Sequence, residues 1–189
     1  MPLSEKFDEA LVYAHELHRD QSRKGGERPY ISHLLAVSSL VLEGGGDEEQ
    51  AIAGLLHDAL EDQGDKTSYA ELEDRFGSRV AGIVRACSDT EVLPKPPWRE
   101  RKQAYLDSLQ HEGADVLLVS AADKLHNARA TLTDTLYSET DVWSRFKAGR
   151  TEQEWYYRAL VEVFEERLPH NPVVRELSRT VDALFSEPR

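Results

Sequence analysis

One short stretch, "GLLHDALEDQGD" at residues 54–65, gathers side chains that could carry out chemistry. His57 and Asp58 stand side by side among apolar residues, and Glu61 and Asp62 follow about one helical turn later. Burying charged groups in an apolar segment costs free energy unless the charges are paired or bind a metal ion. These side chains therefore either face solvent at a helix end or share a ligand that offsets their desolvation.

Polar residues also interrupt two apolar segments elsewhere in the chain. His33 lies within "YISHLLAV", and Asp123 follows the apolar run "LLVSAA". Asn127 comes one turn after Asp123, so the two side chains share a helix face. Together with His57 and Asp58, these segments supply two imidazoles and two carboxylates, a donor set that a divalent cation would satisfy.

Each of these residues also has a simpler interpretation. A lone histidine in an apolar helix is usually a hydrogen-bonded core residue, and Asp123 could pair with Lys124 or Arg129. Residues 58–65 could be a solvated helix end. The combination of an adjacent His-Asp pair, an upstream histidine and a downstream aspartate favours the metal site. We assign no chemistry to the remaining histidines, which are His15, His18, His111, His126 and His170. Of these, His126 has only a weak claim, through its proximity to Asp123.

The composition limits the class of protein. The chain has 189 residues, of which 40% are hydrophobic and 31% charged, and its formal net charge is −12. Such an acidic, globular composition disfavours binding to nucleic acid or to an anionic membrane. Cys87 is the single cysteine, the N-terminus lacks an apolar signal core, and no run approaches the ~18 apolar residues of a membrane span. We therefore expect a cytoplasmic protein.

Helical periodicity of apolar residues covers almost the whole chain and places the polar residues on helices. Ser4 is a candidate N-cap, Pro29 suits a first helical turn, and Gly44 suits a helix end. Three prolines mark residues 89–100 as a loop. The segments expected to be helical are 4–22, 29–44, 47–62, 67–77, 78–89, 99–111, 114–136, 151–168 and 172–185. We therefore expect an all-α fold with a single domain over residues 1–189.

Three motifs follow one another along the chain: "SRKGGERPYISH", "LLHDALED" and "AADKLHNAR". In this order they resemble the HD superfamily of metal-dependent phosphohydrolases, whose ligand order is H…HD…D. More narrowly, the chain resembles the alarmone hydrolases, meaning the Rel/Spo-type hydrolase domains and their stand-alone small relatives. The resemblance runs in register from about residue 7 to 168 and implies an HD-type helical bundle.

The chain departs from the family pattern at a few places. Leu34 stands where the family often has proline, and the proline-rich loop 92–98 lies where relatives vary. Residues 142–159 resemble the final pocket helix of the family only loosely. Nothing that resembles the synthetase and regulatory domains of the long bifunctional enzymes follows, so the resemblance implies a stand-alone hydrolase.

The predicted metal site uses His33, His57, Asp58 and Asp123 as ligands of one divalent ion. Nitrogen and oxygen donors without thiolates favour a Mn²⁺-like site with open positions over structural zinc. A nearby carboxylate can position a water molecule and accept its proton. Glu61, with Asp62 beside it, is the candidate for this role, and the resemblance implies the same role for the pair.

The substrate-binding residues are predicted from their expected proximity to the metal site. Arg23, Lys24 and Lys95 are the only basic residues whose loops we expect to reach the phosphates of a polyanion. Asn127 is expected to hydrogen-bond a ribose or base, and Trp155 or Tyr156 to stack on the base.

The predicted function is a Mn²⁺-dependent hydrolase acting on a small-molecule nucleotide. The resemblance implies removal of the 3′-diphosphate from guanosine 3′,5′-bis(diphosphate), ppGpp, and its pentaphosphate, pppGpp, giving GDP or GTP. One alternative is another HD phosphohydrolase acting on an adenine alarmone, NADPH or another nucleotide. A second is a metal- and nucleotide-binding protein without turnover, against which Glu61 and Asp62 argue. The sequence leaves the oligomeric state open.

Overall fold

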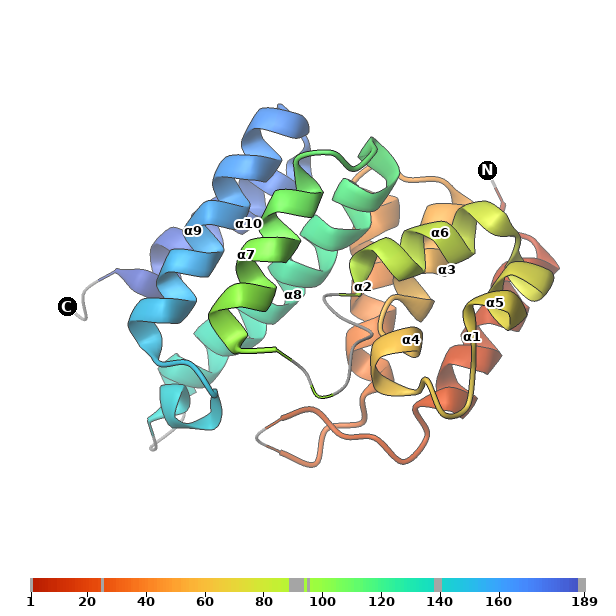
Figure 1. The fold of residues 1–189 in the computed structure, drawn as a ribbon, viewed down its shortest axis with the longest axis horizontal. Coiled ribbons are helices and arrows are strands. Elements are labelled where there is room, and N and C mark those ends of the chain that lie inside the picture. Colours follow the sequence, from red (N-terminus) through yellow and green to blue (C-terminus); the bar gives the residue numbers. More distant parts are fainter. Residues whose placement is uncertain (1, 25, 89–93, 95, 138–140, 187–189) are drawn as a thin grey trace.

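The computed structural model describes residues 2–24, 26–88, 94, 96–137 and 141–186. Helices build this part of the chain, and its one extended pairing is an isolated bridge between Ser22 and Pro29. The predicted all-α fold is therefore confirmed (Figure 1). In chain order the elements are α1 (Glu5–Leu17), α2 (Ile31–Glu43), α3 (Glu48–Leu56), α4 (Ala59–Asp62), α5 (Tyr69–Phe76), α6 (Ser78–Cys87), α7 (Trp98–Leu109), α8 (Ala114–Tyr137), the 3₁₀ helix η1 (Val142–Arg145), α9 (Arg150–Arg167) and α10 (Pro172–Phe185).

Local sequence signals set several helix ends. The Ser4 hydroxyl accepts a hydrogen bond from the backbone N–H of Lys6 at the start of α1, as its N-cap prediction requires. Asp47 and Gln50 form a reciprocal capping box at the start of α3. Gly44 is the C-cap of α2, which confirms the predicted end of that helix.

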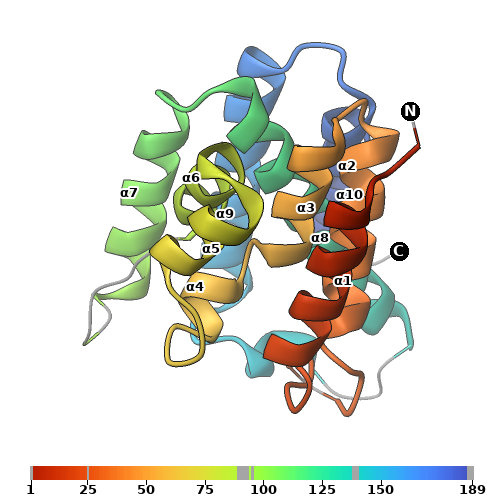
Figure 2. The same ribbon diagram turned by 90° about the vertical axis from the view of Figure 1, so that its right-hand side faces the viewer.

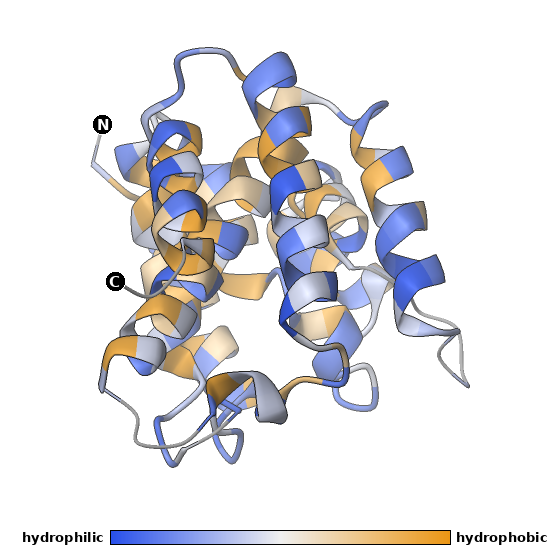
Figure 3. Cartoon of the chain, turned by 90° about the vertical axis from the view of Figure 1, so that its left-hand side faces the viewer, coloured by the Kyte–Doolittle hydropathy of each residue, from blue (hydrophilic) through white to orange (hydrophobic). Residues whose placement is uncertain are grey.

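Helix α8 forms the centre of the bundle and packs against α2, α3, α6, α9 and α10 (Figures 1 and 2). Every residue from Val116 to Asp123 is buried, as the apolar first half of this helix predicts. The outer helices have hydrophilic and hydrophobic sides (Figure 3), and their buried residues face the shared core. None of the helices in the described ranges combines the length and apolar character needed to cross a bilayer.

Helices α2 and α3 approach each other closely at Gly54. A Cβ atom on this residue would lie 3.1 Å from the Cα of Ser38. The Ser38 hydroxyl also donates a hydrogen bond of 2.9 Å to the backbone carbonyl of Ala51. The absence of a side chain at Gly54 thus lets the backbones of α2 and α3 meet. This contact lies one turn before His57, and α2 is the helix that carries His33.

Two predicted helix boundaries are wrong. The expected helix 47–62 is interrupted, because α3 ends at Leu56 and α4 begins at Ala59. The expected helix 4–22 ends at Leu17, after which the chain forms a loop to α2. This loop lies with α4 and η1 at one end of the bundle, the lower end in Figure 1.

Candidate metal centre and active-site cleft

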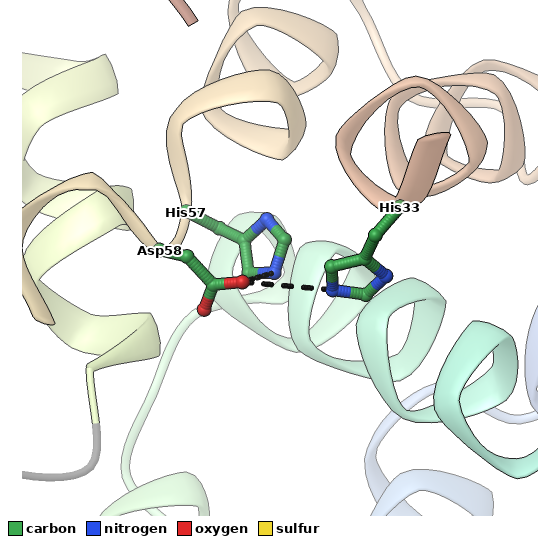
Figure 4. Close-up of side chains that lie close together, drawn as sticks. All are labelled: His33, His57 and Asp58. Carbon is green, nitrogen blue, oxygen red and sulfur yellow. Dashed lines mark ion pairs between the residues drawn. The ribbon is translucent and has the colours of Figure 1, made fainter. Parts of the chain in front are cut away.

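Three side chains from two helical elements converge at this end of the bundle (Figure 4). His33 projects from α2, while His57 and Asp58 occupy the interruption between α3 and α4. One nitrogen of each imidazole and one oxygen of the carboxylate all lie within 4.8 Å of one another. This cluster of His33, His57 and Asp58 could hold a metal ion.

Asp123 of α8 completes the arrangement from a third direction. Its Oδ1 lies 3.2 Å from Nε2 of His33 and 3.6 Å from Nε2 of His57. Asp58 Oδ2 lies 3.6 Å and 3.1 Å from the same two nitrogens. The structure thus brings together all four side chains that the sequence singled out as candidate ligands.

The orientation of His57 suits a metal ligand. Its Nδ1 lies 2.8 Å from the backbone carbonyl of Gly54, to which it donates, so Nε2 is the nitrogen that faces the cluster and would bind a cation. This Nε2 is buried without a hydrogen-bond partner, although the Asp58 carboxylate is near. A cation among the four side chains would satisfy this nitrogen and both carboxylates, so the donor set fits a divalent metal ion.

The electrostatics of the cluster favour bound positive charge. Burial by itself lowers the pKa of His57, but Asp58 and Asp123 outweigh it and hold that pKa well above its usual range. Burial by itself raises the pKa values of the two carboxyls. The nearby His57 nevertheless holds the pKa of Asp58 well below its usual range, and the nearby Lys124 does the same for Asp123. Both carboxylates are therefore ionised at neutral pH, and a proton on His57 is what a cation would replace.

Neighbouring donors orient the two carboxylates. The Tyr30 hydroxyl donates a 2.6 Å hydrogen bond to Oδ2 of Asp58. Lys124 donates to Oδ2 of Asp123 over 2.6 Å, and the Asn127 amide donates to Oδ1 over 2.5 Å. Burial and the Asp58 charge raise the pKa of Tyr30, which keeps this hydroxyl protonated and able to donate.

His126, for which the sequence offers only a weak indication of function, lies next to the cluster. Nδ1 of His126 lies 2.7 Å from Nδ1 of His33. Burial, reinforced by the nearby His33, lowers the pKa of His126 to about 4, so this imidazole is neutral at physiological pH. Its spacing of three residues from Asp123 was the available signal, because residues three apart share a helix face.

The cluster lies in a cleft of about 450 Å³. Glu61 and Asp62 of α4 line the cleft beside the metal cluster. The side chain of Gln21 donates a 2.8 Å hydrogen bond to Oδ2 of Asp62, and Gln63 in turn donates to Gln21 over 2.6 Å. The predicted acidic pair is thus at the site, and side-chain amides hold one member of it.

More cations line the cleft than the sequence predicted. Besides the predicted Arg23 and Lys24, the lining includes Arg28, Lys102, Lys124 and Arg145. The described residues therefore bring more basic side chains to the cleft than the sequence predicted, because segments distant in sequence fold onto it, while contact with phosphates stays a prediction. Lys95 itself lies outside the described residues.

Several of these cations have protein partners. Arg23 donates a 2.5 Å hydrogen bond to Oδ1 of Asn127, which links the loop before α2 to α8. Asp134 accepts hydrogen bonds of 2.8 Å from both Arg28 and Arg145. The predicted substrate residues Arg23 and Asn127 thus contact each other and both line the cleft.

The two aromatic candidates differ in position. Tyr156 lines the cleft, as does Trp98 at the start of α7. Trp155 instead faces a shallower depression between α7 and α9, with the Arg99 guanidinium 3.2 Å from its ring centroid. Of the two aromatic residues expected to stack on the base, the structure therefore places Tyr156 and not Trp155 at the cleft, because adjacent residues on a helix point in different directions.

Comparison with known proteins identifies relatives over most of the chain. Residues 10–153 match the family model of the HD domain. Two curated relatives are named guanosine-3′,5′-bis(diphosphate) 3′-pyrophosphohydrolase MESH1. The Xenopus tropicalis protein is 40% identical over 124 residues, covering 64% of this chain and 66% of its own length. The Drosophila melanogaster protein is 36% identical over 135 residues, covering 70% of this chain and 73% of its own length.

A solved structure extends the likeness beyond the matched sequence. It belongs to a metazoan ortholog of SpoT described as hydrolysing ppGpp and playing a role in starvation responses. The two structures superpose with a TM-score of 0.76 at 28% identity, over 95% of this chain and 96% of the other. Because the family model spans the helices that carry His33, His57, Asp58 and Asp123, this chain belongs to the HD domain family.

Proposed function

We propose that this protein is a metal-dependent hydrolase that removes the 3′-diphosphate from ppGpp and pppGpp to give GDP or GTP and pyrophosphate. The observation that carries the proposal is the convergence of two histidines and two aspartates at a cleft that is also lined by basic side chains and an acidic pair. The names of the relatives support the substrate. We propose that residues 1–189 act as one hydrolase domain.

We propose His33, His57, Asp58 and Asp123 as the ligands of one divalent cation, with Mn²⁺ as the ion. When bound, such a cation neutralises phosphoryl charge and lowers the pKa of water at the site. Tyr30, Lys124 and Asn127 hold the two carboxylates, so these ligands keep their orientation during turnover. No thiolate belongs to the set, which supports Mn²⁺ over structural zinc.

Glu61 accepts the proton of the attacking water in this proposal. The water oxygen bonds to the phosphorus that carries the ribose 3′-oxygen, and the bond between this phosphorus and the 3′-oxygen breaks. The 3′-oxygen takes up a proton to become the 3′-hydroxyl of GDP or GTP, and the diphosphate leaves as pyrophosphate with the oxygen of the water. Asp62 supports Glu61 from the next position, and Gln21 fixes the Asp62 carboxylate through a 2.8 Å hydrogen bond. A positioned carboxylate of this kind contributes roughly 10²- to 10⁴-fold to the rate.

The remaining lining residues of the cleft bind the nucleotide. Arg23 and Lys24 bind phosphate oxygens, and we propose the same role for Lys95, which lies outside the described residues. Asn127 hydrogen-bonds the ribose or base, and Tyr156 stacks on the base. Basic side chains from other elements, Arg28, Lys102, Lys124 and Arg145, also line the cleft and offset the negative charge of its carboxylates, which favours a polyanion in an otherwise acidic protein.

The proposal is tested by incubating the purified protein and Mn²⁺ with ppGpp, pppGpp, their adenine counterparts, NADPH, GTP and GDP. Ion-exchange chromatography resolves the products. We expect GDP or GTP plus pyrophosphate from the guanosine alarmones, and no hydrolysis of GTP or GDP, which lack a 3′-phosphate. Comparable release of orthophosphate from ordinary 5′-nucleotides would contradict the alarmone specificity.

A further inference from the structure

The two imidazoles of the metal cluster have different partners on the nitrogen that faces away from it. Nδ1 of His57 donates to the backbone carbonyl of Gly54 over 2.8 Å. Nδ1 of His33 instead lies 2.7 Å from Nδ1 of another histidine, His126. Histidine ligands of metals commonly donate this second N–H to a carboxylate, a carbonyl or water, which fixes the ring and its tautomer. The partner of this second nitrogen is thus a backbone carbonyl for His57 and a side chain for His33.

A contact between two Nδ1 atoms requires a proton on one ring and a lone pair on the other. If His126 donates, His33 keeps its proton on Nε2, which then points at Oδ1 of Asp123 over 3.2 Å. If His33 donates, its Nε2 lone pair faces the two carboxylates. The second arrangement alone leaves Nε2 of His33 able to bind a cation.

We propose that His126 is the positioning residue of His33, accepting the His33 Nδ1–H at its own Nδ1 and so holding the tautomer that binds metal. The inference rests on the metal centre of the proposed function and adds a residue to it. His33 and Asp123 contact the cation, whereas His126 acts through His33. Among the described residues, the lining of the cleft includes His33 but not His126.

The packing around His33 supports this role. Its ring centroid lies 4.8 Å from that of His126, 5.1 Å from that of His57 and 5.6 Å from that of Tyr30. The side chain of His33 is 1% exposed, so the ring has little freedom to change its partner. Because His126 comes three residues after Asp123 on α8, one helix face presents a candidate carboxylate ligand and the orienting partner of an imidazole.

The test compares His126→Asn with His126→Leu. Oδ1 of asparagine is bonded to Cγ as Nδ1 of histidine is, so the Asn variant retains an acceptor near the same place. Leucine has nearly the shape of asparagine but no acceptor, and it leaves the His33 Nδ1–H unsatisfied. His15→Leu, at an exposed position on α1, is the matched control for loss of a histidine. Each protein is stripped of metal and titrated with Mn²⁺ by calorimetry without nucleotide.

We expect His126→Leu to bind Mn²⁺ roughly 10- to 100-fold more weakly than the wild type, the usual loss for an outer partner of a metal ligand. His126→Asn and His15→Leu should retain most of the affinity. If the Leu variant does not fold, His126→Gln replaces it, because glutamine Oε1 reaches the position of Nε2 rather than that of Nδ1, and it should also bind weakly.

The outcomes separate this inference from the proposed function. If the wild type binds Mn²⁺ and the Leu and Asn variants bind it equally well, or equally weakly, the positioning role is refuted and the metal centre stands. If the wild type itself does not bind divalent cations, the metal centre fails and the role of His126 fails with it.

Discussion

His57 and Asp58 are neighbours in the sequence, yet their side chains meet at one point, with Nε2 and Oδ2 3.1 Å apart. On a continuous helix, adjacent side chains diverge by about 100° around the axis. Helix α3 ends at Leu56 and α4 begins at Ala59, so the two residues lie at the interruption between these helices, although both keep α-helical backbone angles. At this position the adjacent His-Asp pair offers a nitrogen and an oxygen to a single ion.

Removing one carboxylate ligand should abolish metal binding and turnover together. Asp58→Asn keeps the shape of the side chain but removes its charge, and the remaining ligands are too few for tight binding. Metal content after dialysis and the rate of ppGpp hydrolysis measure the two effects. Asp65→Asn, at an exposed position in the same segment, is the control. Full activity of wild-type protein treated with EDTA would contradict a metal requirement.

The Glu61→Gln variant should separate binding from chemistry. The amide keeps the shape but cannot accept a proton, so kcat should fall by roughly 10² to 10⁴. Mn²⁺ and nucleotide should still bind, as calorimetry with each ligand would show. Glu73→Gln on the exposed face of α5 should leave kcat unchanged. A near-normal kcat in Glu61→Gln, or loss of its metal, would show that the assigned base is wrong.

The Arg23→Ala variant should weaken use of the alarmone without loss of metal. A charge-assisted hydrogen bond contributes about 1.5–3 kcal/mol, so kcat/KM should fall by the corresponding factor. The substitution also removes the 2.5 Å hydrogen bond that Arg23 donates to Asn127. Part of the fall in kcat/KM would therefore come from a less well oriented Asn127, which is itself a proposed nucleotide-binding residue on α8. Arg19→Ala, an exposed arginine just after α1, serves as the control. Unchanged kcat/KM in Arg23→Ala would exclude a phosphate contact.

Mn²⁺ affinity should increase with pH. Burial by itself lowers the pKa of His57, but the carboxylates of Asp58 and Asp123 raise this pKa well above its usual range. The protein without metal therefore carries a proton on His57 that the cation must displace. Affinity should therefore fall about tenfold for each pH unit below that pKa, and level off above it. Calorimetry in two buffers of different ionisation enthalpy would count the released proton. The pH range from 5 to 8 covers roughly three units around the ordinary histidine pKa. A Mn²⁺ affinity that does not change over this range would contradict the displacement of a proton from His57.

The close approach of α2 and α3 can be tested through Gly54→Ala. The new Cβ would lie 3.1 Å from the backbone of Ser38, so one helix must shift. Overpacking of this kind costs about 1–3 kcal/mol of unfolding free energy. Because α2 carries His33 and α3 leads to His57, Mn²⁺ affinity should fall too. Chemical denaturation and a Mn²⁺ titration measure the two effects, and unchanged values in both would show that the approach is not tight. Gly82→Ala, where a Cβ meets no atom within 4 Å, is the control.

The sequence was sufficient to predict which helices exist and which four side chains meet at the candidate metal cluster. Apolar periodicity reports which face of a helix is buried, and a polar residue on such a face stands out, as Asp123 does on α8. The break at His57 had no such signal, because the surrounding apolar pattern continues through it. The single domain over residues 1–189 stays a prediction.

Residues brought in by tertiary packing were harder to predict. Lys102 and Arg145 reach the cleft from α7 and η1, and nothing local distinguishes them from solvated surface charges. His126 offered only its spacing from Asp123, since a hydrogen bond between two imidazoles depends on how α2 and α8 pack. Trp155 and Tyr156 are adjacent aromatic residues, and only the orientation of α9 decides which of them lines the cleft.

The path of α8 along the cleft has a consequence for the length of the ligand. Asp123 faces the candidate ligand histidines, and Asp134, eleven residues later, holds Arg28 and Arg145 at 2.8 Å each. A helix rises about 1.5 Å per residue, so these two ends of the cleft are separated by about 16 Å along α8. A ligand that contacts both groups must therefore extend over about this distance along α8. A nucleotide with phosphates on both sides of its ribose, as in the proposed substrate, is long enough to do so, whereas a short phosphate ester is not.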